Sequence, residues 1–214
     1  MCSILHIVTG VREEKAGLRI TVDDEKVFWL SRSDAPDHPL QPGMPIDLPA
    51  FQAWLSTRQY PKALDHALGL LAARARSTQE VREKLEHRKY MEQTIQQVLR
   101  KLEKERLLDD EAFAQSWAAA RSRRQFGRNR ILMELRQKGI SNDAAHRACA
   151  NLDKDETEKA AVELACKLLK KRQSEADPRK TLQKVMAAMA RRGFSYESAG
   201  SAVKAALEKL REEN

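Results

Sequence analysis

The hydrophobic pattern of the chain changes near residue 63. Before that point, residues 4–8, 18–22 and 26–30 form short apolar or alternating runs with many β-branched side chains, which is typical of strands. The acidic stretch 23–25 separates the second run from the third, so the pattern predicts a β-hairpin. A proline-rich loop follows, and then a short helix over residues 49–58 that Pro61 is predicted to end.

After residue 63 the apolar positions recur with the period of a helix. Within residues 95–102 the apolar side chains are spaced i, i+3, i+4, i+7, which places them on one buried face. Ser77, three residues before Glu80, has the spacing of a capping box, in which a hydroxyl and a carboxylate satisfy backbone N–H groups at a helix start. The rest of the chain is therefore predicted to be helical.

The helical part repeats itself. Residues 85–90 align with 135–140 and with 189–194, at offsets of 50 and 54 residues, and a period of this length indicates a repeat architecture. Each copy ends a helix with a basic residue and then a turn residue. Gly139 and Gly193 suit the left-handed backbone of such a turn. Lys89 must either distort its turn or adopt that conformation itself.

These patterns predict a mainly α protein of tandem three-helix repeats in a curved elongated array, preceded by a small β-hairpin-containing N-terminal segment. We expect a small α+β segment at 1–62 and three-helix repeats at 63–110, 111–155 and 156–214. Ser141 and Ser195 are predicted to cap the third helices of the last two repeats. One such unit buries little apolar surface, so neighbouring repeats are expected to stack.

Charge is distributed unevenly along the chain. Residues 1–62 carry seven Lys and Arg against eight Asp and Glu, whereas residues 63–214 carry 32 against 23. The positive excess is largest in the second and third repeats. An excess of this kind predicts a polyanionic or acidic partner.

Composition and motif searches exclude several classes of protein. Cys2, Cys149 and Cys166 lack CxxC spacing, so we interpret them as small buried side chains in a reducing compartment. The start lacks the features of a signal peptide, and no run approaches the ~18 apolar residues of a membrane span. A soluble, cytoplasmic monomer with no membrane association, no metal and no cofactor is expected.

The search for catalytic residues finds no motif. GxxxxGK[ST], GxGxxG, HExxH and GxSxG are all absent, and the five histidines are scattered. Asp109 and Asp110 could hold a metal, but no further ligand stands at a suitable spacing, so helix capping is favoured. The chain is not expected to be an enzyme.

Candidate binding residues gather in the second repeat. Residues 112–133 contain Arg121, Arg123, Arg124, Arg128 and Arg130 but no Asp or Glu. Five uncompensated guanidinium groups predict binding to phosphates or acidic side chains. A solvated helix end whose cations complement the helix dipole would give the same pattern.

Two further basic groups have open roles. Arg88, Lys138 and Arg192 occupy the same helix end in each repeat, with Arg191 beside the last, and they could form a binding stripe or merely complement helix dipoles. A second group, formed by Lys167, Lys170, Lys171 and Arg172, is diluted by Glu163 and Glu175.

Short motifs in a fixed order resemble a known family. Arg-Ala-Arg-Ser at 74–77 is followed by Glu80, and Leu-Leu-Asp-Asp at 107–110 is followed by Phe-Ala at 113–114. Arg121, Gly127, Ile131, Glu-Leu at 134–135 and Lys-Gly-Ile at 138–140 complete the series. Together they resemble the signature of the RecX family, bacterial regulators of the RecA recombinase. The resemblance covers residues 63–155, and the repeat pattern extends it over 156–210.

The resemblance implies a non-catalytic protein that binds RecA and its filament on single-stranded DNA, and duplex DNA more weakly. Such a protein restrains ATP hydrolysis, strand exchange and coprotease activity by RecA. The alternatives are a duplex-DNA regulator with helix-turn-helix-like units and a scaffold that binds protein alone. Candidate RecA- or DNA-binding residues are Arg74, Arg76, Arg88, Arg121, Arg123, Arg124, Arg128, Arg130, Arg136, Lys138, Lys170, Lys171, Arg172, Arg191 and Arg192.

Overall fold

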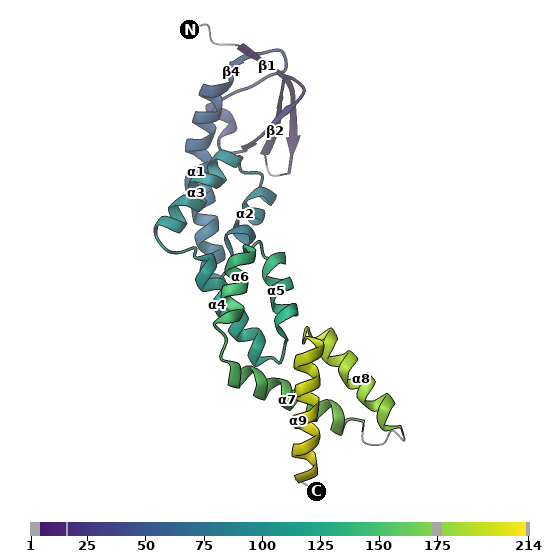
Figure 1. The fold of residues 1–214 in the computed structure, drawn as a ribbon. Coiled ribbons are helices and arrows are strands. Elements are labelled where there is room, and N and C mark those ends of the chain that lie inside the picture. Colours follow the sequence, from purple (N-terminus) through teal and green to yellow (C-terminus); the bar gives the residue numbers. More distant parts are fainter. Residues whose placement is uncertain (1–4, 16, 173–176, 213–214) are drawn as a thin grey trace. The chain divides into compact units, whose positions relative to one another are not determined.

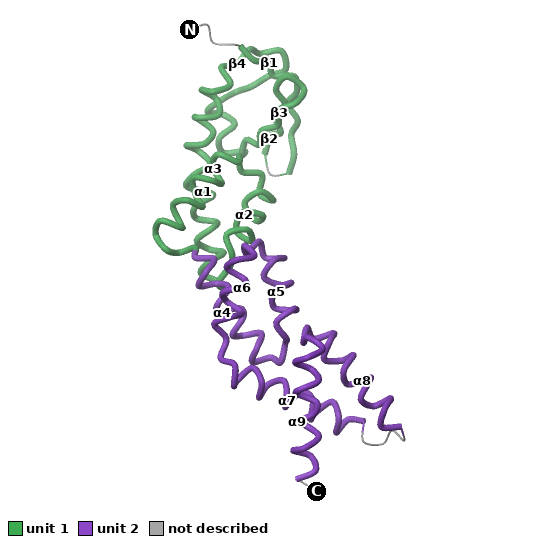
Figure 2. The backbone as a smooth tube through the Cα atoms, in the orientation of Figure 1, with its two compact units in different colours: residues 1–108 green, residues 109–214 purple. Residues whose placement is uncertain are grey.

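The protein consists of two compact units, residues 1–108 and 109–214 (Figure 2). The structure is a computed structural model, and it describes residues 5–15, 17–172 and 177–212. Cys2, Ile4 and Glu175, which the sequence analysis considered, lie outside the described residues.

The first unit begins with a four-stranded antiparallel sheet in the order β3-β2-β1-β4 (Figure 1). The strands are β1 (Leu5–Glu14), β2 (Gly17–Val22), β3 (Lys26–Ser31) and β4 (Pro45–Asp47). The predicted hairpin is confirmed as β2 and β3. Asp23 and Asp24, at its tip, have φ of 51° and 58°, the left-handed values that a tight hairpin turn requires.

The pattern missed β4 and the second half of β1. Strand β4 has three residues and begins at Pro45, and such a short edge strand tolerates proline because it pairs on one side only. One face of the sheet is buried. It contributes Ile20, Phe28 and Leu30 to a core shared with Phe51 and Leu55 of helix α1 (Leu48–Ala73).

Helix α1 runs through Pro61, so the prediction that Pro61 ends a short helix is wrong. Its first half packs on the sheet, whereas Ala63 and Ala67 in its second half are fully buried in the next core. Burial on both sides of Pro61 offsets the cost of an interior proline, about 3 kcal/mol. The predicted segment boundary after residue 62 therefore falls inside a continuous helix.

The second half of α1 forms a three-helix domain with α2 (Thr78–His87) and α3 (Glu92–Lys104). A one-turn 3-10 helix, η1 (Ala35–Asp37), lies in the loop before β4. The predicted capping box is confirmed, since Ser77 accepts from the backbone N–H of Glu80 and the Glu80 carboxylate accepts from that of Ser77. The predicted apolar face of 95–102 is buried.

The second unit contains two further three-helix domains. The first comprises α4 (Asp110–Arg123), α5 (Arg128–Gln137) and α6 (Asn142–Ala150). The second comprises α7 (Lys154–Lys170), α8 (Pro178–Arg191) and α9 (Tyr196–Glu212). The predicted class, tandem three-helix repeats after a small strand-containing segment, is confirmed.

Capping residues act largely as predicted. Asp109 accepts from the N–H of Ala112 at 2.9 Å, so the aspartate at this helix start caps it. Ser141 and Ser195 accept from the N–H groups of the third residues after them, at 3.3 and 3.1 Å.

The two described cysteines, Cys149 and Cys166, are both shielded at least in part from solvent. Cys149 is buried, and burial raises the pKa of its thiol. Cys166 is partly buried against the apolar core of α7, α8 and α9. Over the described ranges no helix combines the length and apolar character needed to cross a bilayer.

Candidate nucleic-acid and protein interface

The second helix of each three-helix domain ends in the same turn. Arg88, Lys138 and Arg192 are the C-cap residues, as the repeat predicts. The next residue is left-handed in every case, with φ of 64° at Lys89, 75° at Gly139 and 90° at Gly193. Lys89 therefore adopts the glycine conformation rather than distorting the turn.

An aromatic ring organises the basic residues of the second unit. Phe126, in the loop between α4 and α5, lies under three guanidinium groups, which we call the Phe126 cluster. The guanidinium carbons of Arg121, Arg130 and Arg192 lie 5.6, 5.3 and 5.4 Å from the ring centre. Each distance falls within the range of a cation–π contact.

Glu134 neutralises part of this cluster. Its carboxylate accepts from Arg130 Nε at 3.1 Å and from Trp117 Nε1 at 3.2 Å, and it lies 2.6 Å from Arg121 Nε. The N–H of Arg121 Nε is poorly directed for a hydrogen bond, so this contact is a charge pair. The prediction of five uncompensated arginines is therefore wrong for Arg121 and Arg130, because the acid-free stretch ends one residue before Glu134.

Trp117 continues the arrangement along α4. Arg121 lies 4.4 Å from the centre of its ring and Lys138 Nζ lies 4.2 Å from it. The ring also stacks on Phe113 with centres 5.8 Å apart. These contacts hold Arg121 and Lys138 in place. We therefore assign both residues a structural role within the second unit.

The Phe126 cluster spans two domains because two glycines meet there. The N–H of Gly127 donates to the carbonyl of Arg192 at 2.8 Å, and the N–H of Asn129 donates to the carbonyl of Gly193 at 3.0 Å. A Cβ on Gly127 would lie 2.4 Å from the backbone of Gly193, and one on Gly193 would lie 2.4 Å from the backbone N of Arg130. This Gly127–Gly193 contact requires glycine on both sides.

Four arginines around this contact remain exposed: Arg123, Arg124, Arg128 and Arg191. We call them the outer arginines. Within the described ranges none of them makes an ion pair within 4.0 Å. The guanidinium of Arg128 lies 3.4 Å from His146 Nδ1, and Arg123 lines a small cleft beside Asp153 without pairing with it.

The other candidates serve local structure. Arg74 pairs with Glu80 at 3.0 Å, and Arg76 Nε donates to the carbonyl of Leu70 at 3.1 Å. Arg136 Nε donates to Asn142 Oδ1 at 2.7 Å, and Arg172 donates to the carbonyl of Leu168 at 3.1 Å. Three exposed candidates lie away from the Phe126 cluster in sequence: Arg88, Lys170 and Lys171.

Sequence reasoning assigned no role in this site to four residues that build it: Trp117, Phe126, Gly127 and Glu134, although Gly127 and Glu134 stand among the motif residues of the family resemblance. A signal was present for two of them. Phe126 and Gly127 interrupt the arginine run 121–130, and an aromatic residue beside a glycine within a basic run suggests stacking and close backbone approach.

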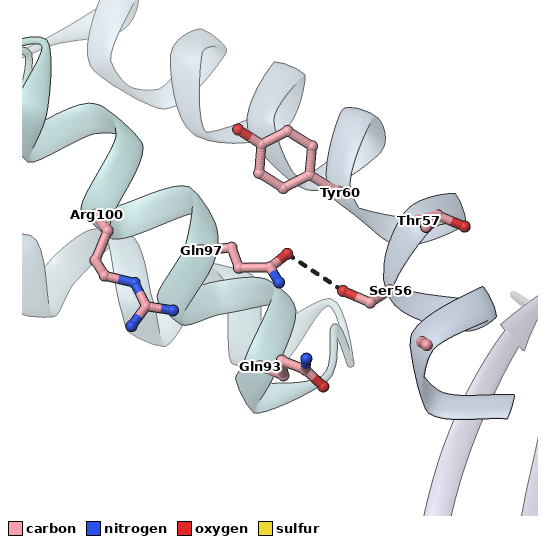
Figure 3. Close-up of a pocket in the computed structure, with 7 residues that line it drawn as sticks. Ser56, Thr57, Tyr60, Gln93, Gln97 and Arg100 are labelled. Carbon is pink, nitrogen blue, oxygen red and sulfur yellow. Dashed lines mark hydrogen bonds between the residues drawn. The ribbon is translucent and has the colours of Figure 1, made fainter. Parts of the chain in front are cut away.

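A groove in the first unit lies between α1 and α3 and has a volume of about 680 Å³ (Figure 3). Ser56 Oγ donates to Gln97 Oε1 at 3.3 Å across it, and Arg100 is the charged residue in its lining. The lining lacks a nucleophile–base pair. Across the described residues no group of three or more His, Cys, Asp or Glu could hold a metal ion.

Family models match all three helical domains. The first, second and third three-helix domains of RecX match residues 63–102, 109–148 and 155–203. A regulatory protein RecX from Amycolatopsis mediterranei is 32% identical over 72% of this chain and 86% of its own length. One from Chlorobaculum tepidum is 35% identical over 68% and 88%.

A crystal structure of a regulatory protein RecX is also similar. It covers 94% of this chain and 99% of its own, with a TM-score of 0.65 and 25% identity. A RecX from Lactobacillus salivarius shares the fold, with a TM-score of 0.66. With three matching domains and relatives above 30% identity over most of their length, the chain belongs to the RecX family.

Proposed function

We propose that this chain is a non-catalytic modulator of the RecA recombinase. It binds the RecA filament on single-stranded DNA through the outer arginines and restrains ATP hydrolysis, strand exchange and coprotease activity. The observation that carries the proposal is the exposure of Arg123, Arg124, Arg128 and Arg191 beside a backbone contact that holds two domains together.

The physical argument separates the inner cations from the outer ones. Arg121, Arg130 and Arg192 are occupied by Glu134, by Phe126 or by a backbone carbonyl. Exposed guanidinium groups without carboxylate partners retain their capacity for bidentate bonds to phosphate or to acidic side chains. Both groups occur on a DNA-bound protein filament, so one surface can serve either contact.

The helix-turn-helix alternative has less support. A recognition helix contacts bases with residues at its N-terminal end. Here α3 begins with Glu92, which accepts from Arg82 at 2.6 Å and from Gln96 at 2.8 Å. Bonding to Arg82 and Gln96 lowers the pKa of Glu92, so the carboxylate at this helix start is ionised and already bonded within the chain, and it is not free to contact a DNA base.

The deciding experiment measures ATP hydrolysis by RecA on single-stranded DNA with increasing amounts of this chain. We expect hydrolysis to fall, and replacement of the four outer arginines by Ala to weaken the effect at least tenfold in the concentration required, since each charged hydrogen bond is worth about 1.5–3 kcal/mol. Unchanged RecA turnover at saturating chain would contradict the proposal.

A matched control removes the same charge elsewhere. Arg32, Arg58, Arg82 and Arg147 each pair with a carboxylate of this chain. Their joint replacement by Ala should leave inhibition within about twofold, because surface ion pairs of this kind contribute about 0–1 kcal/mol each. Equal loss in both variants would indicate a net-charge effect without a defined surface.

Salt dependence separates the protein-only scaffold from a chain that contacts DNA. Direct contact with single-stranded DNA gives a log–log slope of about −0.7 per phosphate neutralised. A flat response over 50–200 mM salt, roughly the range over which such binding weakens strongly, would favour the scaffold.

A further inference from the structure

The sheet of the first unit has a solvent face that the packing does not use. In the strand register Arg12 pairs with Arg19, and Arg19 pairs with Trp29. Side chains alternate along a strand, so these three lie in one row across β1, β2 and β3. Ile20 and Phe28, one residue away, point to the buried core on the other face. The outer row is therefore an aromatic side chain beside two cations.

The end of helix α2 extends this row. Lys89 Nζ lies 5.7 Å from the centre of the Trp29 ring. Together with the sheet edge it borders a pocket of about 310 Å³. Lys15, Trp29, Arg88, Lys89 and Tyr90 are among the residues that line it. The lining thus joins two aromatic rings with cations from two separate elements.

Most of the lysine and arginine side chains that line this pocket have no carboxylate partner within the described residues. Lys62 is occupied, because it donates to Asp34 at 2.6 Å and to Ser31 at 3.0 Å. Arg19, beside Trp29 in the strand register, does not line the pocket, and its buried Nε lacks a hydrogen-bond partner. Lys15 and Arg88 are exposed, and no ion pair involves either of them over the described ranges.

Two carboxylates also line the pocket, Glu14 and Asp34. Asp34 is neutralised by Lys62, so Glu14 is the remaining negative group set against Lys15, Arg88 and Lys89. The balance at the pocket is positive.

The buried side-chain amide of Gln59 fixes strand β3 relative to the segment that joins α2 to α3. Gln59 Nε2 donates to the carbonyl of Trp29 at 3.1 Å, and Gln59 Oε1 accepts from the N–H of Met91 at 2.8 Å. The side chain is 6% exposed. Because this bridge joins β3 to the start of α3, Trp29 and Lys89 form a site that exists before any ligand arrives.

We propose that this surface, the Trp29 platform, binds single-stranded nucleic acid. One unstacked base lies on the Trp29 ring, and the neighbouring phosphates contact Lys15, Arg88 and Lys89. An aromatic face on a sheet, flanked by cations, suits this ligand because every base can stack on it while the cations follow the backbone. A duplex presents no unstacked base face and is the weaker ligand. The platform lies outside the arginine surface of the proposed function, and its binding needs no RecA.

The direct test uses the full chain and a labelled oligothymidylate of about 20 nucleotides, without RecA. Replacing Trp29 by Ala should weaken binding roughly tenfold, the usual effect of removing one stacking residue, while Trp29→Phe should stay within about threefold. Trp54→Ala is the matched control, since Trp54 is also partly exposed and lies by a cation, Arg58, but belongs to α1 and packs against the core under the sheet. It should bind like the unchanged chain.

A second readout reports stacking itself and does not depend on a variant that may unfold. The chain contains three tryptophans, so a form with Trp54→Phe and Trp117→Phe reports Trp29 fluorescence alone. Saturating oligothymidylate should quench it, and duplex of equal length should quench it less. Unquenched Trp29 emission, or equal affinity of the Trp29→Ala chain, would overturn the proposal.

Salt dependence tests the phosphate contacts. Replacing Arg88 and Lys89 by Ala should make the log–log slope shallower by about 1.4, or about 0.7 for each phosphate lost. Replacing Lys101 and Arg147, which pair with Glu105 and Glu111, should leave it unchanged; equal changes in both variants would contradict the assigned contacts. The two proposals can fail separately, because loss of oligothymidylate binding leaves RecA inhibition to be measured through the outer arginines.

Discussion

The two units join their parts by different chemistry. In the first unit the sheet is attached to the three-helix domain through side chains, with Gln59 bridging β3 and α3 and Lys62 pairing with Asp34. In the second unit the two three-helix domains meet through backbone, at the Gly127–Gly193 contact. Equivalent turns, at Lys89 after α2 and at Gly193 after α8, lie at these two attachments.

This difference explains which residues the turn accepts. At Gly193 the neighbouring backbone leaves no room for a Cβ, so the turn needs glycine for space as well as for conformation. At Lys89 the turn faces Trp29 and a pocket, so a side chain fits and only its left-handed backbone is unfavourable, by about 1–2 kcal/mol. A repeated turn can thus serve as a close contact in one place and carry a charge in another.

The largest expected effect comes from filling the backbone contact. Gly193→Ala should destabilise the second unit by about 3 kcal/mol, since the added Cβ meets backbone and the residue has φ of 90°. Urea unfolding measured by circular dichroism checks this. Gly200→Ala is the control, because Gly200 lies in α9 with nothing within 4 Å, and it should be stabilising by up to about 1 kcal/mol. Equal effects would refute the close approach.

The next effect tests the Glu134 carboxylate, which pairs with both Arg121 and Arg130. Glu134→Gln should cost the second unit about 2 kcal/mol, because Arg121 and Arg130 lose their common carboxylate in a site that leaves Glu134 11% exposed. Glu111→Gln is the control, as its partner Arg147 is more than half exposed, and it should cost under about 1 kcal/mol. Similar losses from both changes would show that the Phe126 cluster does not depend on Glu134.

A smaller effect concerns pH and the side-chain attachment of the sheet. Burial alone would raise the pKa of Asp34, but hydrogen bonds from Lys62 and Ser31 outweigh it and lower the pKa below the ordinary value of 3.8. A carboxyl with a lowered folded-state pKa contributes stability above its unfolded pKa, and that stability is lost as pH falls through the folded value.

Asp34→Asn should therefore cost the first unit about 1.5 kcal/mol at pH 7, and the gap between variant and unchanged chain should close below about pH 4. Thermal unfolding between pH 2.5 and 7 measures this. A constant gap over the whole range would contradict the assignment.

The smallest effect has the opposite sign. Lys89→Gly should stabilise the first unit by about 1 kcal/mol, since glycine adopts φ of 64° without strain. It should also weaken oligothymidylate binding a few-fold, since it removes one phosphate contact. Lys104→Gly, at the end of α3, provides a binding control. A loss of stability on Lys89→Gly would mean that the lysine contact with Trp29 outweighs the strain.

Local features of the fold could be predicted from sequence, and contacts between distant segments could not. The hairpin at 18–30, the capping box at Ser77 and the glycine turns depend on spacing within a few residues, and all were confirmed. Pro61 misled because a local breaker was outweighed by burial that only the assembled cores provide. The pairing of Gly127 with Gly193 joins positions 66 residues apart, which no periodicity records.

The candidate site was predicted in composition but not in organisation. The arginine run was visible, but only Arg121 and Arg130 of the run contact the Phe126 ring, and the third contact comes from Arg192. Which arginines are neutralised depends on Glu134, whose carboxylate reaches back across a turn of α5 and across to α4. The Trp29 platform was not predicted at all, because it needs the strand register and the end of α2 together.

Helix α1 carries a consequence for folding. One continuous helix supplies apolar side chains to two cores, with Phe51 and Leu55 in the sheet core and Ala63 and Ala67 in the helical one. Neither core can unfold without exposing apolar side chains of the same helix, α1. The amide protons of β2 and of α3 should then exchange with solvent at similar opening free energies, as one cooperative foldon in which loss of the strands melts the helices too.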